Sequence, residues 1–95
     1  SALYGMKKAI EMQNIKVTSI DMIKHTINLS IDIRWNEVSI DTGPIKMQQY
    51  PEEVTENIER VCDARVHKML RYLVDEGFIS NDIPLHANIK VCITA

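Results

Sequence analysis

Apolar residues recur every three or four positions from residue 51 to residue 77, which predicts one long amphipathic helix. Pro51 suits the first helical position, because its missing N–H would have no partner inside the helix. Gly77 can adopt the left-handed conformation that commonly ends a helix. We therefore expect a helix from Pro51 to Gly77, with a stripe made of Val54, Ile58, Val61, Cys62, Met69 and Leu73.

Strict alternation of apolar and polar residues runs from Ile23 to Trp35, and this period of two is typical of a half-buried antiparallel strand. The Asn-Glu pair at 36–37 suits a two-residue hairpin turn. We expect strands at Ile23–Trp35 and Val38–Thr42, joined by this hairpin, with Trp35 and Val38 as neighbours on the core face.

Shorter patterns complete the chain. A helix is expected at Ala2–Asn14, followed by a strand from Ile15 whose alternation breaks near residues 19–21, as at a bulge or a tight turn. Alternation returns at Ala87–Thr94 and predicts a last strand. Residues 1–5 precede Met6 and are either native or an addition.

These elements predict the order α-β-β-β-α-β and one α+β domain over residues 1–95. A single core is expected because a chain of this size cannot support two. We expect a mainly antiparallel sheet of three or four strands, with the one long helix packed on its apolar face.

Composition narrows the function classes. The net charge is −2, so the chain is a poor default candidate for generic phosphate binding. Cys62 and Cys92 lack CxxC spacing and are expected to be free thiols in a reducing compartment. No apolar run approaches the ~18 residues of a membrane span. A cytoplasmic protein without a membrane partner is expected.

Arg65 lies inside the apolar stripe, ~20–40° from Ile58 and Met69 on a helical wheel. An arginine there either lays its methylenes on the core and sends its charge to water, or pairs with a carboxylate of the sheet or of a partner. The first outcome is commoner, but the central position of Arg65 leads us to expect pairing, with an acid such as Asp21 or Glu37.

The apolar arc widens toward the end of the long helix, where Val66, Leu70 and Val74 extend it beyond what a single sheet covers. Either the first helix or another chain covers this surplus. Arg65, Val66, Leu70 and Val74 are therefore candidate interface residues, and a second copy of the chain or another protein is the expected partner.

The opposite helix face carries Arg60, His67, Lys68 and Arg71. These residues suit nucleic acid phosphates or an acidic protein, yet acids early and bases late in a helix are also what the helix dipole favours. A solvated face is the favoured interpretation, and nucleic-acid binding is the alternative function.

No nucleophile motif, phosphate loop or set of metal ligands stands out, so no catalytic residue, metal or cofactor is expected. Asp41 before Thr42-Gly43 gives a weak nuclease-like signal, which turn-forming residues also explain. The sequence favours a non-enzymatic protein-interaction or regulatory module that acts as a homodimer.

Overall fold

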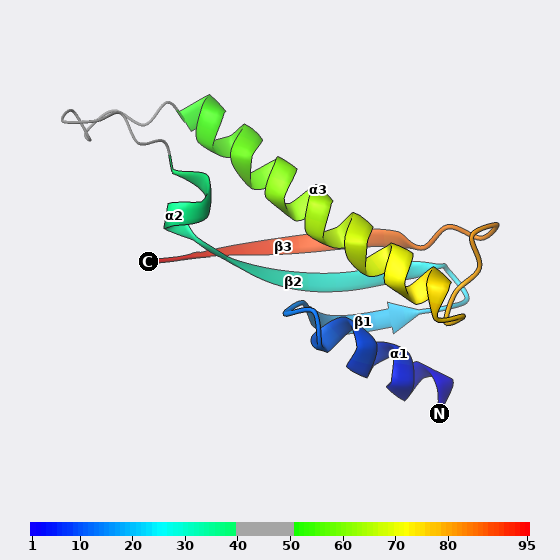
Figure 1. Cartoon of the computed structure of the whole chain (residues 1–95). Coiled ribbons are helices and arrows are strands. Elements are labelled where there is room, and N and C mark those ends of the chain that lie inside the picture. The colour runs from blue at the N-terminus through cyan, green and yellow to red at the C-terminus, as the bar shows by residue number, and fades with distance from the viewer. Residues whose placement is uncertain (40–50) are drawn as a thin grey trace.

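The computed structural model describes residues 1–39 and 51–95, and its elements follow the order α-β-β-α-α-β (Figure 1). The chain forms a small α+β domain, as expected, although the order differs from the predicted one. Its helices are α1 (Ala2–Glu11), α2 (Trp35–Val38) and α3 (Pro51–Asp75), and its strands are β1 (Lys16–Asp21), β2 (Thr26–Arg34) and β3 (His86–Thr94).

The sheet has three strands in the order β1-β2-β3, with β2 at the centre. β1 pairs with β2 antiparallel, and β3 pairs with β2 parallel along its whole length, from Thr26 opposite His86 to Arg34 opposite Thr94. The prediction of a mainly antiparallel sheet is therefore wrong in detail, because the sheet is mixed. A parallel neighbour requires a crossover connection, and α3 supplies it.

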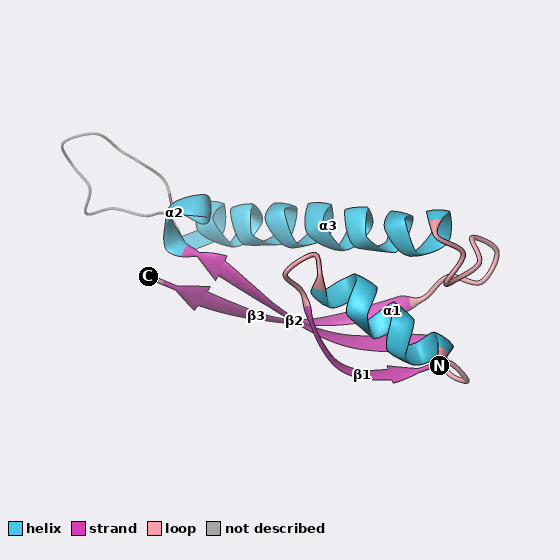
Figure 2. Ribbon diagram, turned by 60° about the horizontal axis from the view of Figure 1, so that its bottom comes forward, coloured by secondary structure: helices cyan, strands magenta, loops and turns pink. Residues whose placement is uncertain are grey.

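Both longer helices lie on one side of the sheet (Figure 2). Every second residue of β2 points toward them and is buried, and these residues are Ile27, Leu29, Ile31 and Ile33. Met6 and Ile10 from α1 and Met69 and Leu73 from α3 complete this aliphatic core. On the other face, a hydrogen-bonded chain of Ser19, Asn28 and Asn88 crosses all three strands at 2.7 and 3.1 Å.

The long helix is confirmed, and Gly77 ends it as predicted. Gly77 has a φ of +80°, in the left-handed region. Its N–H donates to the Val74 carbonyl at 3.0 Å, and the N–H of Phe78 donates to the Leu73 carbonyl at 2.8 Å. This pair of bonds is a Schellman motif, which satisfies carbonyls that the helix itself leaves open.

The predicted hairpin at residues 36–37 is wrong. Residues 35–38 form the single turn α2, in which Val38 is fully buried while 42% of Trp35 is exposed. The Asn57 side chain donates to the Val38 carbonyl at 2.9 Å and fixes α2 against α3. The helical turn carries the chain away from the end of β2, and the Glu37 carboxylate accepts the N–H of Arg34, which the predicted partner strand Val38–Thr42 would need. The later residues of that strand lie outside the described residues.

The start of the predicted central strand is also wrong, because residues 22–25 form the turn of a β1–β2 hairpin. Asp21 Oδ1 accepts the N–H groups of Ile23 and Lys24, each at 3.0 Å, and His25 has a φ of 53°. Ile23 is 93% exposed instead of facing the core. The break in alternation is confirmed as a bulge between Val17 and Ser19. α1 ends at Glu11 rather than at Asn14, which has a φ of 61°.

Candidate functional site

The outer edge of β3 is the candidate site. Among the described residues, no strand pairs with the side of β3 that faces away from β2. The N–H of His86 donates to the His25 carbonyl at 2.7 Å, so it points toward β2. Backbone groups alternate in direction along a strand. The groups of Ala87, Ile89, Val91 and Ile93 therefore point outward and can pair with another strand.

The β3 edge carries few of the features that keep natural sheet edges from pairing, such as proline, bulges, charges or a short length. β3 contains no proline, and its register with β2 is continuous over nine residues. Its core-facing side chains are only partly covered, and Ile93 remains 43% exposed. Lys90, on the polar face, is its one lysine or arginine.

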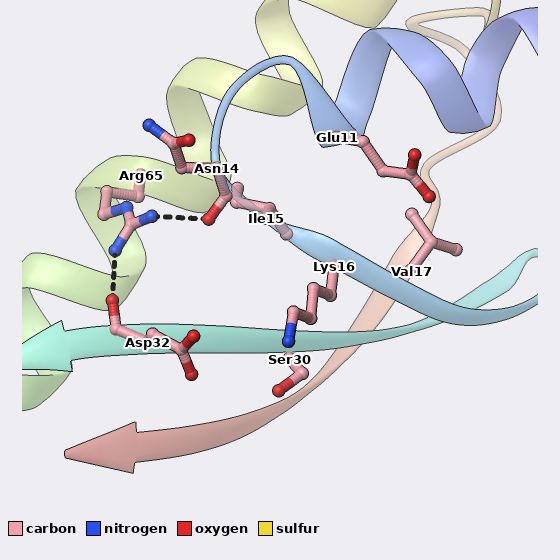
Figure 3. Close-up of a pocket in the computed structure, with 8 residues that line it drawn as sticks. All are labelled: Glu11, Asn14, Ile15, Lys16, Val17, Ser30, Asp32 and Arg65. Atoms are coloured by element: carbon pink, nitrogen blue, oxygen red, sulfur yellow. Dashed lines mark hydrogen bonds between the residues drawn. The ribbon is translucent and has the colours of Figure 1, made fainter. Parts of the chain in front are cut away.

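The edge of β2 that extends beyond β1 is, by contrast, closed by side chains. β1 stops pairing at Lys16, opposite Ser30, so the rest of β2 has no strand on that side among the described residues. Arg65 Nη1 donates to the Asp32 carbonyl at 3.0 Å (Figure 3). Two residues further along, Glu37 Oε2 accepts the N–H of Arg34 at 2.8 Å. These two bonds occupy backbone groups that another strand would use.

Arg65 is paired, but the prediction of a carboxylate partner is wrong. Its second bond runs from Nη2 to the Asn14 carbonyl at 2.8 Å, so both of its acceptors are backbone oxygens. Asp32 contributes its carbonyl and not its carboxylate. Arg65 thus joins α3, the α1–β1 turn and β2, beside an open cavity of about 650 Å³ that Lys16 also lines. Its planar guanidinium suits this task, because one side chain can reach two separate acceptors.

The edge of β1 differs again, because β1 is short and irregular. It has six residues, and the bulge between Val17 and Ser19 interrupts its pairing. Lys16 and Asp21 place a charge at each end. A short, bulged and charged edge is a poor template for another strand. Of the sheet edges among the described residues, only β3 offers a long and regular one.

The four predicted interface residues lie in different places. Val66 is buried in the core with 8% exposure, and Arg65 bonds to the two carbonyls on the β1 side. Leu70 and Val74 lie ~140° and ~180° from Arg65 around α3. They line a small groove of about 190 Å³ together with Ile79, Pro84 and Leu85. Because Leu85 directly precedes β3, this groove lies next to the beginning of the open edge.

The four predicted basic residues are all exposed on α3. Arg60 Nη2 donates to Asn57 Oδ1 at 2.6 Å, and Arg71 lies 3.6 Å from the Asp75 carboxylate. His67 and Arg71 also line the groove beside Leu70, whereas Lys68 does not. The structure thus places His67 and Arg71 on the flank of α3 next to β3.

The described part of the chain contains no cluster of side chains of the kind that holds a metal ion. Residues 1–39 and 51–95 contain no group of three His, Cys, Asp or Glu side chains that could hold a metal ion. Cys62 and Cys92 are both free thiols, and burial raises the pKa of Cys62 above its ordinary value. Asp41 lies outside the described residues.

Sequence reasoning missed the open edge of β3. It identified the alternation of residues 87–94, yet alternation alone does not say which strand will lie at an edge of the sheet. The parallel pairing with β2 decides that, and it depends on the path of α3. The signals that were available are the length of the strand and its lack of proline and clustered charge.

Comparison with protein-family models, curated proteins and solved structures found no match to this chain. Among the helices of residues 1–39 and 51–95, none is both long and apolar enough to span a membrane.

Proposed function

We propose that this protein is a non-enzymatic interaction module and that the edge of β3 pairs with the β3 edge of a second copy. The observation that carries the proposal is the contrast among the sheet edges. Side chains close the free end of β2, and β1 is short and bulged, whereas β3 presents nine regular residues. Adding a strand at such an edge is a common mode of protein recognition.

A second copy is the partner that fits both faces of β3. In an antiparallel pair, directly opposite residues share a face of the sheet. Two copies of β3 related by a two-fold axis would therefore place apolar residues opposite apolar ones and polar residues opposite polar ones. A register centred on Ile89 or on Val91 sets Lys90 opposite Asn88 or Cys92 of the second copy, so that two lysines do not meet.

The exposed apolar surface supports the same partner. Ile93 is 43% exposed and belongs to the row of β3 that faces the helices. In the register centred on Ile89, Ile93 of the second copy lies opposite Leu85, beside the groove that Leu70 and Val74 line. Pairing then removes from water apolar surface that the single chain leaves uncovered.

The test compares two substitutions at neighbouring positions of β3. Ile93→Glu places a charge on the side of the sheet that the dimer buries, whereas Thr94→Glu places the same charge on the open polar face. By analytical ultracentrifugation, we expect the wild type and Thr94→Glu to be dimers and Ile93→Glu to be a monomer. Circular dichroism should show that Ile93→Glu is still folded. A wild type that is monomeric at high concentration would exclude the proposal, as would a dimer unaffected by Ile93→Glu.

Nucleic-acid binding by Arg60, His67, Lys68 and Arg71 is the weaker second candidate. All four side chains are exposed, but Arg60 and Arg71 already contact Asn57 and Asp75. Glu56, Glu59 and Asp63 lie on the same helix and would repel phosphates. Salt-dependent binding to mixed oligonucleotides, lost in Lys68→Glu, would favour this function over the first.

A further inference from the structure

We propose that one end of the molecule, where α1 begins and the β1–β2 turn lies, binds the surface of a membrane that contains anionic lipids. Exposed apolar side chains of this end would enter the lipid interface, and the lysines around them would meet the headgroups. β1 and β3 are opposite edges of the sheet, so this inference does not depend on the proposed pairing of β3.

The apolar side chains at this end form a group that we call the apolar tip, made of Leu3, Tyr4, Met22 and Ile23. All four are exposed, and Leu3 and Tyr4 are at least half exposed. Leu3, Met22 and Ile23 line one open hollow, and Leu3 and Tyr4 line the next one, beside β1. Figure 2 shows the start of α1 close to the β1–β2 turn. Exposed apolar residues gathered in this way mark a contact with a protein or a membrane.

The β1–β2 turn holds Ile23 at the most exposed point of the tip. Asp21 Oδ1 accepts the N–H groups of Ile23 and Lys24, and His25 adopts a left-handed conformation. Polar residues and glycine dominate turns of this kind. Ile23 contributes little to the core, because 93% of it is exposed. A contact outside the single chain would remove this side chain from water.

Lysines surround the apolar tip. Residues 1–25 carry four lysines and two acids and so have a net charge of +2, whereas residues 26–95 have a net charge of −4. Lys7 and Lys24 line the two hollows, and neither forms an ion pair within the described part of the chain. The Lys8 ammonium lies 5.4 Å from the centre of the Tyr4 ring. Apolar side chains with lysines around them fit a surface with an apolar interior and anionic headgroups.

The acids at this end of the molecule lie away from the tip. Asp21 binds the backbone of the turn, and the others are at the end of α3 or in its connection to β3: Asp75, Glu76 and Asp82. This connection approaches α1 at Gly5, where an added Cβ would lie 3.3 Å from the Phe78 ring. Gly5 is ~160° around α1 from Leu3, which lies on the side of β1. The helix α1 thus separates these acids from the tip.

The shape of the tip favours a membrane over a folded partner. A stable protein–protein interface buries roughly 800 Å² on each partner, which requires a broad face. The tip is one corner of the molecule and includes the end of a tight turn (Figure 2). A membrane surface binds through a small inserted apolar area combined with electrostatic attraction. One protruding corner is therefore sufficient for reversible binding.

The experiment measures cosedimentation with vesicles and uses variants of the β1–β2 turn, so it does not depend on whether residues 1–5 are native. One set of vesicles contains phosphatidylcholine alone, and the other contains about one third phosphatidylserine. We expect the wild type to prefer the second set. Ile23→Gln should weaken this binding about tenfold at low and at high salt, because it removes the inserted side chain. Lys24→Gln should weaken it about fivefold at low salt only, because salt screens the headgroup charge.

Met12→Gln and Lys68→Gln are the matched controls. Met12 is exposed but follows the other end of α1, and Lys68 lies on α3. Both variants should bind about as the wild type does. Weakening by these controls equal to that by the turn variants would overturn the proposal, as would binding that Ile23→Gln leaves unchanged. A wild type that binds neither set of vesicles would overturn it in favour of a protein partner, and equal binding to both sets would remove the role of anionic lipid.

Discussion

The free end of β2 and the outer edge of β3 both lack a neighbouring strand among the described residues, but side chains bond to the backbone groups of β2 only. Each presents backbone groups that no strand of the described chain pairs. On β2, Arg65 donates to the Asp32 carbonyl and Glu37 accepts the N–H of Arg34. Along β3, no comparable side chain among the described residues covers the outward groups. Two well-placed side chains are enough to close a short stretch of edge, so a long edge without them suggests a surface kept for pairing.

The largest effect should come from proline at neighbouring positions of β3. By the alternation of the strand, the N–H of Lys90 points toward β2 and that of Val91 points outward. Lys90→Pro removes a bond between β2 and β3, and we expect it to destabilise the fold by about 3 kcal/mol or more. Val91→Pro removes only an outward group and should give a folded monomer. Thermal unfolding and sedimentation measure both effects, and two equally folded dimers would contradict the assigned direction of the edge.

A smaller effect is expected at the closed edge. Arg65→Ala leaves the carbonyls of Asn14 and Asp32 without their donor, and we expect a loss of about 1–3 kcal/mol in the free energy of unfolding. Arg65→Met keeps the apolar stem against the core and should cost less. Urea denaturation measures the difference. A change below about 0.5 kcal/mol for Arg65→Ala would mean that the two hydrogen bonds of Arg65 contribute nothing measurable to the free energy of unfolding.

The same substitution also tests whether Arg65 keeps the free end of β2 from pairing with another strand. If Arg65 prevents pairing at the end of β2, Arg65→Ala should form concentration-dependent species larger than those of the wild type. Light scattering would detect them. A variant that is destabilised but keeps the wild-type mass would assign Arg65 a purely stabilising role.

The smallest effect concerns the reactivity of the two thiols, Cys62 and Cys92, which chemical labelling measures. Cys92 lies on the open face of β3 and is partly exposed, so it should react with a thiol reagent in the folded protein. Cys62 is buried, and burial raises its pKa, so it should react only after unfolding. The raised pKa means that the folded state holds the proton more tightly. The Cys62 thiol therefore contributes fully to stability below the ordinary thiol pKa, and this contribution is lost as the pH rises from there through the raised pKa of the folded state. Equal reaction rates at the two residues would contradict this placement.

The sequence was sufficient for α3 and for the middle of β2, where the local signal is strong. The helical period, Pro51 and Gly77 specified α3, and alternation specified which residues of β2 are buried. The sequence did not predict the ends of β2. Alternation continues from Ile23 to Trp35, whereas the strand itself begins at Thr26 and ends at Arg34. What ends the strand is a turn held by Asp21 on one side and α2 on the other.

The partners of Arg65 and the free edge of β3 lay beyond sequence reasoning for a different reason. Every residue has a carbonyl, so no sequence pattern marks Asn14 and Asp32 as the acceptors. Their availability results from the place where β1 begins and from the left-handed turn at Asn14. In the same way, β3 becomes an edge only once α3 has returned the chain parallel to β2. Both features depend on the tertiary arrangement.

The parallel pairing of β2 with β3 also has a consequence for how the chain folds during synthesis. Residue 26 pairs with residue 86, so the ribosome must deliver α3 and the following loop before the central strand acquires its second neighbour. The β1–β2 hairpin can form early, because its contacts are local, whereas closing the sheet is a late step with a large loop-closure cost. Until then the nascent chain exposes the edge of β2 that β3 later covers, and the buried row of β2 lacks the cover of α3. This interval, rather than the finished domain, is where a chaperone would have the most surface to bind.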